Sequence, residues 1–201
     1  MPQRFTSLDN PRVAELLMQG AIGVIPTDTV YGLVGSATNQ TAISRMYAAK
    51  DRPEHAGTII GASTQQFCEL GFDRQQLEAV SRFWPASLSV VLDASGVAGY
   101  LKESRSSLPV RIPDAARLGA LLKEVGPLMT TSANTPGAPT STTIKMAERY
   151  FGADVDFYVD AGDLGERPPS TIIGFDEKGE TIVYRHGAVD IASIASTQEH
   201  R

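Results

Sequence analysis

The sequence predicts an α/β fold, on the basis of two observations. Short apolar runs at residues 21–25 and 127–131 are bounded by glycine or proline, which is typical of buried strands. Segments such as residues 115–125 carry apolar side chains at helical spacing. A chain of 201 residues with 42% hydrophobic content can bury one core, so we expect a single domain over residues 1–190 and a loose tail over residues 191–201.

The first expected elements are a helix and a strand. Asn10 can cap a helix whose first turn accepts Pro11, an apolar stripe follows, and Gly20 ends it. The run 21–25 is then predicted to be a strand that delivers the threonine-rich loop 26–32 at its end. Binding sites of α/β proteins tend to lie beyond the carboxyl ends of such strands.

A second helix is expected from Thr41, where Ile43, Met46 and Tyr47 recur at helical spacing. It must stop before Pro53, because the residue preceding a proline disfavours the α region. We therefore expect Arg52 to be extended.

The rest of the chain repeats the two patterns. The remaining expected helices are 63–70, 73–83, 115–125 and 144–151, and the expected strands are 58–60, 88–92, 108–112, 127–131, 157–159, 171–173 and 181–184. The last two strands should pair as a hairpin across residues 176–180.

Composition argues against several classes of protein. A net charge of −5 disfavours bulk attraction to nucleic acid, so any RNA contact would be local. The single cysteine, Cys68, excludes an internal disulfide, and the three histidines are too widely spaced for a zinc pattern. We find no apolar run of membrane-spanning length and no signal-type segment, and we expect a cytoplasmic protein.

Lys50 and Arg52 flank one acid and precede a proline, which suggests a phosphate clamp at a helix end. The alternative is a solvated helix end, because cations also complement the helix dipole there. His55, in the following loop, is either a general base beside this clamp or a surface histidine.

Two further arginines lie in or next to expected strands. Arg111 lies in an apolar run, where a buried arginine needs either a ligand or an internal ion pair, for which Asp114 is the candidate. Arg185 follows the last expected strand, and its simpler interpretation is a surface charge at a strand end.

Hydroxyl side chains gather where apolar runs end or loops begin. These pairs are Thr27 and Thr29, Thr130 and Ser132, Thr140 and Ser141, and Ser170 and Thr171. Singly each could close a turn, whereas together with the cations they suggest an anionic ligand; Asn134 is expected to hold its loop through backbone bonds. The chain has no P-loop, dinucleotide-binding or nucleophile-elbow motif.

Seven motifs resemble the YrdC-like (TsaC-type) threonylcarbamoyl-AMP synthases in order and approximate spacing. They are residues 25–33, 50–53, 83–85 with Leu88, 110–113, 132–134 with Gly137, 169–172, and 184–185 with 187–188, and they cover about residues 10–190. The chain is similar to the single-domain form of this family.

The resemblance implies a twisted, mixed but mostly parallel sheet with flanking helices around a large concave basic cavity. It implies a nucleotidyltransferase that joins L-threonine, bicarbonate or CO2 and ATP into L-threonylcarbamoyladenylate and releases pyrophosphate. Mg2+ would accompany ATP, and the product would pass to a tRNA-modifying transferase complex.

The resemblance also implies roles for individual residues. Lys50 and Arg52 would face the triphosphate as catalytic cations, with Ser107, Ser132, Thr140 and Arg185 around the nucleotide. Thr29, Arg111, Thr130 and Ser170 would line the threonine end, where Arg111 can hold a carboxylate through two parallel hydrogen bonds.

One stretch departs from the family pattern. The family usually shows an Asn-Pro-Leu or Lys-Gly/Pro-Leu element after the proline of the clamp, often followed by a histidine, and this chain has Ala56 and Gly61 at those polar positions. The alternative function is therefore a diverged, non-catalytic module that binds a nucleotide or RNA.

Overall fold

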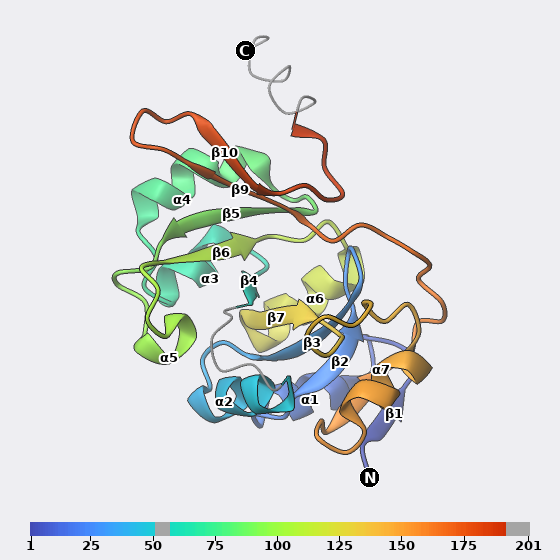
Figure 1. Ribbon diagram of the computed structural model, residues 1–201. Coiled ribbons are helices and arrows are strands. Elements are labelled where there is room, and N and C mark those ends of the chain that lie inside the picture. The colour runs from blue at the N-terminus through green and yellow to red at the C-terminus, as the bar shows by residue number, and fades with distance from the viewer. Residues whose placement is uncertain (51–56, 192–201) are drawn as a thin grey trace.

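The computed structural model describes residues 1–50 and 57–191, which build one ten-stranded sheet flanked by helices (Figure 1). The strands are β1 (Gln3–Phe5), β2 (Gly23–Pro26), β3 (Tyr31–Ser36), β4 (Thr58–Ile60), β5 (Leu88–Asp93), β6 (Ser107–Arg111), β7 (Leu128–Ser132), β8 (Phe157–Val159), β9 (Thr171–Phe175) and β10 (Thr181–Arg185). The helices are α1 (Pro11–Met18), α2 (Gln40–Ala49), α3 (Thr64–Glu69), α4 (Arg74–Val80), α5 (Gly99–Lys102), α6 (Ala116–Val125) and α7 (Ile144–Phe151), with a 3-10 turn at Ser81–Phe83.

The sheet runs in the order β1-β8-β2-β3-β7-β4-β6-β5-β9-β10. It is mixed, as expected, but partly rather than mostly parallel: β1–β8, β8–β2, β4–β6 and β5–β9 are the parallel pairs among the described strands. The short connection between β2 and β3 explains part of this difference, because a tight turn can join only antiparallel neighbours.

Most elements begin and end where the sequence predicts. Asn10 caps α1 by accepting a hydrogen bond from the Arg12 amide, and Gly20 follows that helix with φ of +84°. The expected helix 73–83 is instead α4 followed by the 3-10 turn. The expected hairpin is β9 with β10, at the top of Figure 1.

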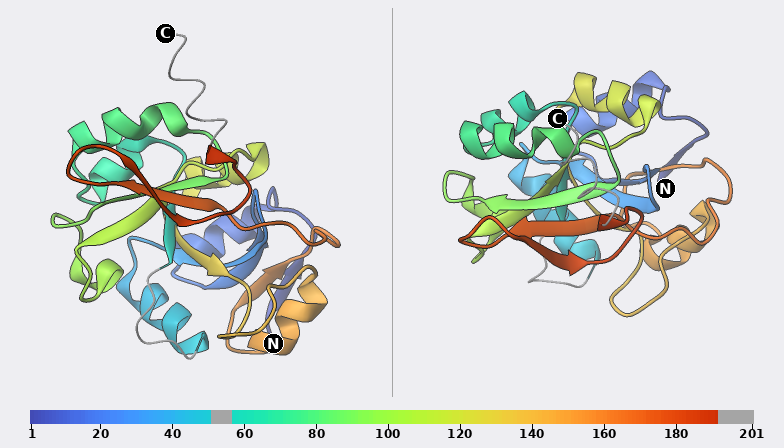
Figure 2. Two further views of the ribbon diagram at one scale, coloured as in Figure 1. Left: turned by 45° about the horizontal axis from the view of Figure 1, so that its top comes forward. Right: turned by 90° about the horizontal axis from the view of Figure 1, so that it is seen from above.

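Alternation along the strands divides the core into two parts. Leu33 and Ile59 pack into one cluster with residues of α2, α3, α4 and α7. Val34 and Ile60, their neighbours along the chain, pack into a second cluster with residues of α1 and α6. Figure 2 shows α1 and α6 side by side on one side of the sheet.

The face under α1 and α6 changes character along its strands. In the pairing of β4 with β7, Ile60 lies opposite Leu128 and Thr58 lies opposite Thr130, so all four side chains share one face. The apolar pair lies in the cluster under α1 and α6, whereas the threonine pair lies beyond it. The fold therefore leaves a polar part of this face for a site.

No helix within the described residues has both the length and the apolar character needed to cross a bilayer.

Candidate active site

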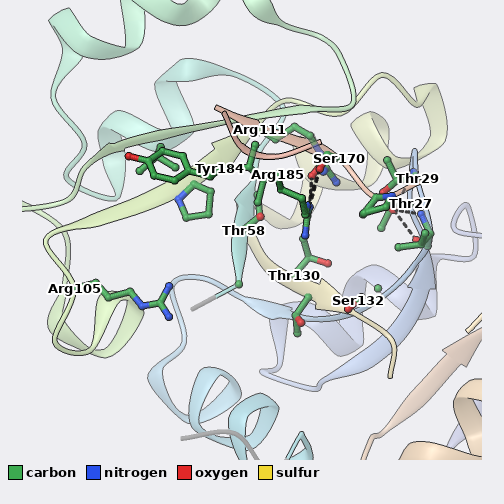
Figure 3. A pocket seen from close by; sticks show the side chains of 18 of the residues that line it. Thr27, Thr29, Thr58, Arg105, Arg111, Thr130, Ser132, Ser170, Tyr184 and Arg185 are labelled. Carbon is green, nitrogen blue, oxygen red and sulfur yellow. Dashed lines mark hydrogen bonds between the residues drawn. The ribbon is translucent and has the colours of Figure 1, made fainter. Parts of the chain in front are cut away.

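A pocket of about 620 Å³ lies over this polar part of the sheet (Figure 3). The segments that line it come from the β2–β3 loop, α2, the central strands and the β9–β10 hairpin. Its described lining consists of Thr27, Thr29, Val30, Gly32, Tyr47, Lys50, Gly57, Thr58, Val91, Ser104, Arg105, Ser106, Ser107, Pro109, Arg111, Thr130, Thr131, Ser132, Pro169, Ser170, Ile172, Tyr184 and Arg185. This lining contains four cationic side chains, many hydroxyls and no carboxylate, which suits an anionic ligand.

The threonine loop is held by its own hydroxyl. Thr27 Oγ1 donates to the Val30 carbonyl oxygen at 2.6 Å and accepts from the amides of Thr29 and Val30, both at 3.2 Å. Gly32 follows, and a Cβ there would lie 2.6 Å from Thr130 Oγ1. The glycine thus allows β3 to carry the loop close to β7, and Thr29 lines the pocket.

Arg111 is buried at the end of β6 and pairs with Asp28 of the threonine loop. Arg111 Nη2 lies 3.0 Å from Asp28 Oδ1, and the two side chains are 4% and 1% exposed. Ser87 Oγ donates to the other carboxylate oxygen at 2.8 Å. Burial lowers the pKa of Arg111, and the Asp28 charge acts in the opposite direction. The alternative of an internal ion pair with Asp114 is therefore wrong: the acidic partner is Asp28, which the chain fold brings from 83 residues away.

Arg185 is held beside Arg111 by the start of the hairpin. Its Nε and Nη2 donate to the Ser170 carbonyl oxygen at 3.0 and 2.8 Å, and Nη2 also donates to Ser170 Oγ at 3.0 Å. Burial and the positive charge of Arg111 lower the pKa of Arg185. Arg185 is exposed at the strand end, as its simpler interpretation expected, and its guanidinium is in addition fixed by Ser170 at the pocket wall. Two guanidinium groups held near each other favour an anion between them.

Lys50 directly follows α2 and is only 3% exposed. Its Nζ donates to Thr131 Oγ1 at 2.9 Å and to the Ser132 carbonyl oxygen at 2.6 Å, with Asn134 Oδ1 at 3.4 Å. The interpretation of Lys50 as a solvated charge at a helix end is therefore wrong. The ammonium is a fixed positive charge in the pocket wall, close to the end of β7.

The pocket gathers most of the predicted site residues. Those that line it are Thr29, Lys50, Ser107, Arg111, Thr130, Ser132, Ser170 and Arg185. Thr140 is not among the lining residues, and Asn134 holds its loop as expected, since Nδ2 donates to the Ala138 carbonyl oxygen at 2.7 Å. Arg52, His55 and Ala56 lie outside the described residues.

Gly61 does not line the pocket. Its backbone follows β4, and a Cβ at this position would lie 2.7 Å from the Phe67 ring. A histidine side chain would have to displace that ring, so position 61 of this chain is a packing position.

Sequence reasoning missed several lining or supporting residues. They are Asp28, Tyr47, Thr58, Arg105, Thr131 and Tyr184. Asp28 had a readable signal, because it is an acid inside a run of hydroxyls after a buried strand. Arg105 had none, because it lies in a polar connection whose course only the fold defines; Figure 3 shows it at the opposite end of the pocket from Thr27 and Thr29.

A sequence profile described as "Telomere recombination", which covers Sua5, YciO and YrdC proteins, matches residues 15–187. This chain belongs to the Sua5/YciO/YrdC family. A family member from Mycobacterium leprae is 32% identical over 183 residues, which are 89% of this chain and 83% of that protein. The Vibrio vulnificus protein named threonylcarbamoyl-AMP synthase is 31% identical over 163 residues, which are 78% and 87% of the two chains.

Solved structures of the family have the same fold. P. abyssi Sua5 complexed with L-threonine superposes with a TM-score of 0.84 at 25% identity, over 98% of this chain and 60% of that one. The chain thus spans less than two thirds of that Sua5. E. coli YciO superposes with a TM-score of 0.80 at 24% identity, over 95% and 98% of the two chains, and this likeness concerns the fold alone.

Proposed function

We propose that this protein is an L-threonylcarbamoyladenylate synthase. It would join L-threonine, bicarbonate or CO2 and ATP, and release pyrophosphate. The observation that carries the proposal is the buried Arg111–Asp28 pair with Arg185 beside it, on the polar part of the sheet face. Relatives named threonylcarbamoyl-AMP synthase and the threonine complex of P. abyssi Sua5 support it.

The charges around Arg111 and Arg185 suit an amino acid carboxylate. Asp28 neutralises Arg111, and the charge of Arg185 remains to be balanced by a ligand. The bond to Asp28 uses Nη2 of Arg111, which leaves other guanidinium donors for a carboxylate. Thr29, Thr130 and Ser170 add hydroxyls that can read the polar groups of threonine.

The nucleotide would take the end near Lys50. Its ammonium supplies a point charge for the triphosphate, and Ser107 and Ser132 supply hydroxyls beside it. The contact of Lys50 with Asn134, at 3.4 Å, is longer than its bonds to Thr131 and Ser132 and is more easily exchanged for a phosphate oxygen. Arg52 and Thr140 complete the nucleotide set by resemblance.

Mg2+ would arrive on the phosphate oxygens of ATP. The described lining contributes hydroxyls and cations but no carboxylate, and no group of three His, Cys, Asp or Glu side chains in the described residues could hold a metal. This donor set fits a metal carried by the nucleotide, whose charge it would help to neutralise.

The reaction then depends on position and charge. The threonine amine and bicarbonate form a carbamate with loss of water; a carbamate oxygen then attacks the α-phosphorus, and the bond to pyrophosphate breaks. Cations around the phosphates offset charge on the leaving group, and fixed geometry replaces a protein nucleophile. We propose that the labile product passes to a transferase that modifies tRNA, with any RNA contact of this chain being local.

A non-catalytic binding module is the alternative that the experiment must exclude. The test is pyrophosphate release from ATP with Mg2+ and bicarbonate, with and without L-threonine. We expect threonine-dependent release, and we expect Arg111→Lys to raise the KM for threonine about tenfold, since a lysine cannot form the paired hydrogen bonds. Arg117→Lys on the exposed face of α6 is the matched control and should leave the KM unchanged. ATP binding without threonine-dependent release would establish the binder instead.

A further inference from the structure

The hydroxyl of Tyr47, a residue that lines the pocket, has no acceptor for its proton among the described residues. Tyr47 lines the pocket, and its hydroxyl oxygen is shut off from solvent with no hydrogen-bond partner in the described part of the chain. A buried hydroxyl left unpaired costs free energy of folding. The other well-buried tyrosines avoid this cost: Tyr31 donates to the Gly162 carbonyl oxygen at 2.8 Å and Tyr158 to that of Gly152 at 2.9 Å.

Tyr47 lies one helical turn before Lys50. The Lys50 amide donates to the Tyr47 carbonyl oxygen at 3.2 Å, and residues three apart share one face of a helix. The phenol therefore stands on the same side of α2 as the cation assigned to the phosphates.

Burial, two opposite charges and one backbone amide act on the Tyr47 phenol. Burial raises the pKa of Tyr47 to about 12, and the charge of Glu103 acts in the same direction. The Arg105 charge and the Gly57 amide act to lower it. The Gly57 amide can only donate to the phenol oxygen, so the phenolic proton has no acceptor in either case. At neutral pH the phenol is a protonated donor in need of an acceptor.

We propose that the Tyr47 hydroxyl is a further binding group of this pocket and donates a hydrogen bond to the polyphosphate of ATP. The proposal rests on the proposed function, because it places ATP in the same pocket. Among its substrates the polyphosphate is the acceptor-rich group that also suits Lys50 and Arg105. Because the hydroxyl is closed to solvent, the pocket wall must shift slightly when the nucleotide binds.

Tyr47→Phe tests this inference, because it removes one oxygen atom and no hydrogen bond that the phenol donates within the described residues. Calorimetric titration with MgATP, pyrophosphate and L-threonine separates the sites. We expect the Kd values of MgATP and pyrophosphate to rise roughly tenfold, as for the loss of a hydrogen bond to a charged group. The Kd of L-threonine should stay the same, and the stability of the unliganded protein should stay equal or rise.

Tyr100→Phe is the matched control. Tyr100 donates to the Ala37 carbonyl oxygen at 3.0 Å and does not line the pocket. Its loss should lower stability and leave all three Kd values unchanged. Equal MgATP affinity in wild type and Tyr47→Phe, or a loss of stability in Tyr47→Phe without a change in affinity, would overturn the inference alone. A wild-type protein that binds no MgATP would overturn the proposed function as well.

Discussion

At the scale of single residues, the pocket depends on charges that the protein has removed from water. Arg111 and Asp28 are both nearly fully buried, and each compensates the desolvation of the other. Ser87 satisfies the second carboxylate oxygen, so the acid is bonded on both sides. Asp28 is thus a positioning residue that fixes the guanidinium which would hold the threonine carboxylate.

Asp28→Asn should destabilise the protein strongly. It leaves Arg111 as a buried cation without its counter-charge, and breaking such a pair costs about 3 kcal/mol of unfolding free energy. Urea denaturation measures the loss. Asp114→Asn is the control, because Asp114 lies on the exposed surface three residues after Arg111. Equal stability of the two variants would contradict the role of the pair.

The residue scale also shows what could be predicted from sequence. The position of Lys50, between a helix and a proline, marked it as a cation of interest, and the structure places it in the pocket wall. The partner of Arg111 could not be predicted, because a local acid and a distant one look alike in a sequence. Tyr47 was interpreted as an apolar helix position, since periodicity does not show where a phenolic hydroxyl ends.

At the scale of elements, one carboxylate joins three of them. Asp156, just before β8, accepts hydrogen bonds from Arg45 of α2 at 2.7 and 2.9 Å and from the Ile22 amide, just before β2, at 2.8 Å. Burial acts to raise the pKa of Asp156, but the Arg45 and Ile22 hydrogen bonds and the Arg45 charge outweigh it, so the pKa lies below its ordinary value.

This lowered pKa predicts an acid-dependent stability. A carboxyl whose folded pKa lies below its unfolded pKa stabilises the protein above the unfolded value and loses that contribution as pH falls through the folded value. We expect wild type to lose more stability than Asp156→Asn between about pH 6 and about pH 3. Urea midpoints at the two pH values measure this difference. Parallel losses in both proteins would show that Asp156 does not contribute.

A strained turn carries Arg105 into the pocket. Glu103 has φ of +52°, and the Arg105 amide closes the turn onto the Lys102 carbonyl oxygen at 2.9 Å. A glutamate in this region pays for its Cβ, whereas glycine would not.

Glu103→Gly should therefore stabilise the protein by about 1 kcal/mol, after the greater freedom of glycine in the unfolded chain is subtracted. Thermal unfolding measures the gain. Ser104→Gly, at the next position and without a positive φ, is the control and should lower stability. A lower stability of Glu103→Gly would contradict the strain.

Some helices and strands could be predicted from the sequence and others could not. Helices with caps and amphipathic stripes, such as α1, and short apolar strands, such as β4, were predicted from the sequence. Strand β3 was not predicted, because its glycines are typical of a loop, although its six residues are all buried and it lies between β2 and β7 in the sheet. The three-residue β1 is too short for a pattern and depends on pairing with β8.

At the scale of the whole molecule, the pocket exists because distant segments meet around the polar part of one sheet face, with Lys50 reaching it from α2 on the other side of the sheet. The threonine loop follows β2, Lys50 follows α2, and Ser170 and Arg185 come from either end of the β9–β10 hairpin. Helices α1 and α6 cover the apolar part of that face and leave the polar part open. The resemblance of seven motifs to one family predicted that these segments share a site. The spacing of hydroxyls and cations along the chain predicted only that the ligand is anionic.

The proposed reaction is tested most directly by following the carbon of bicarbonate into the product. The protein is incubated with MgATP, L-threonine and 13C-bicarbonate, and the nucleotides are analysed at once by mass spectrometry. We expect an adenylate that contains threonine and one 13C atom, formed together with pyrophosphate. An unlabelled threonine adenylate, or ATP that binds and stays intact, would contradict it.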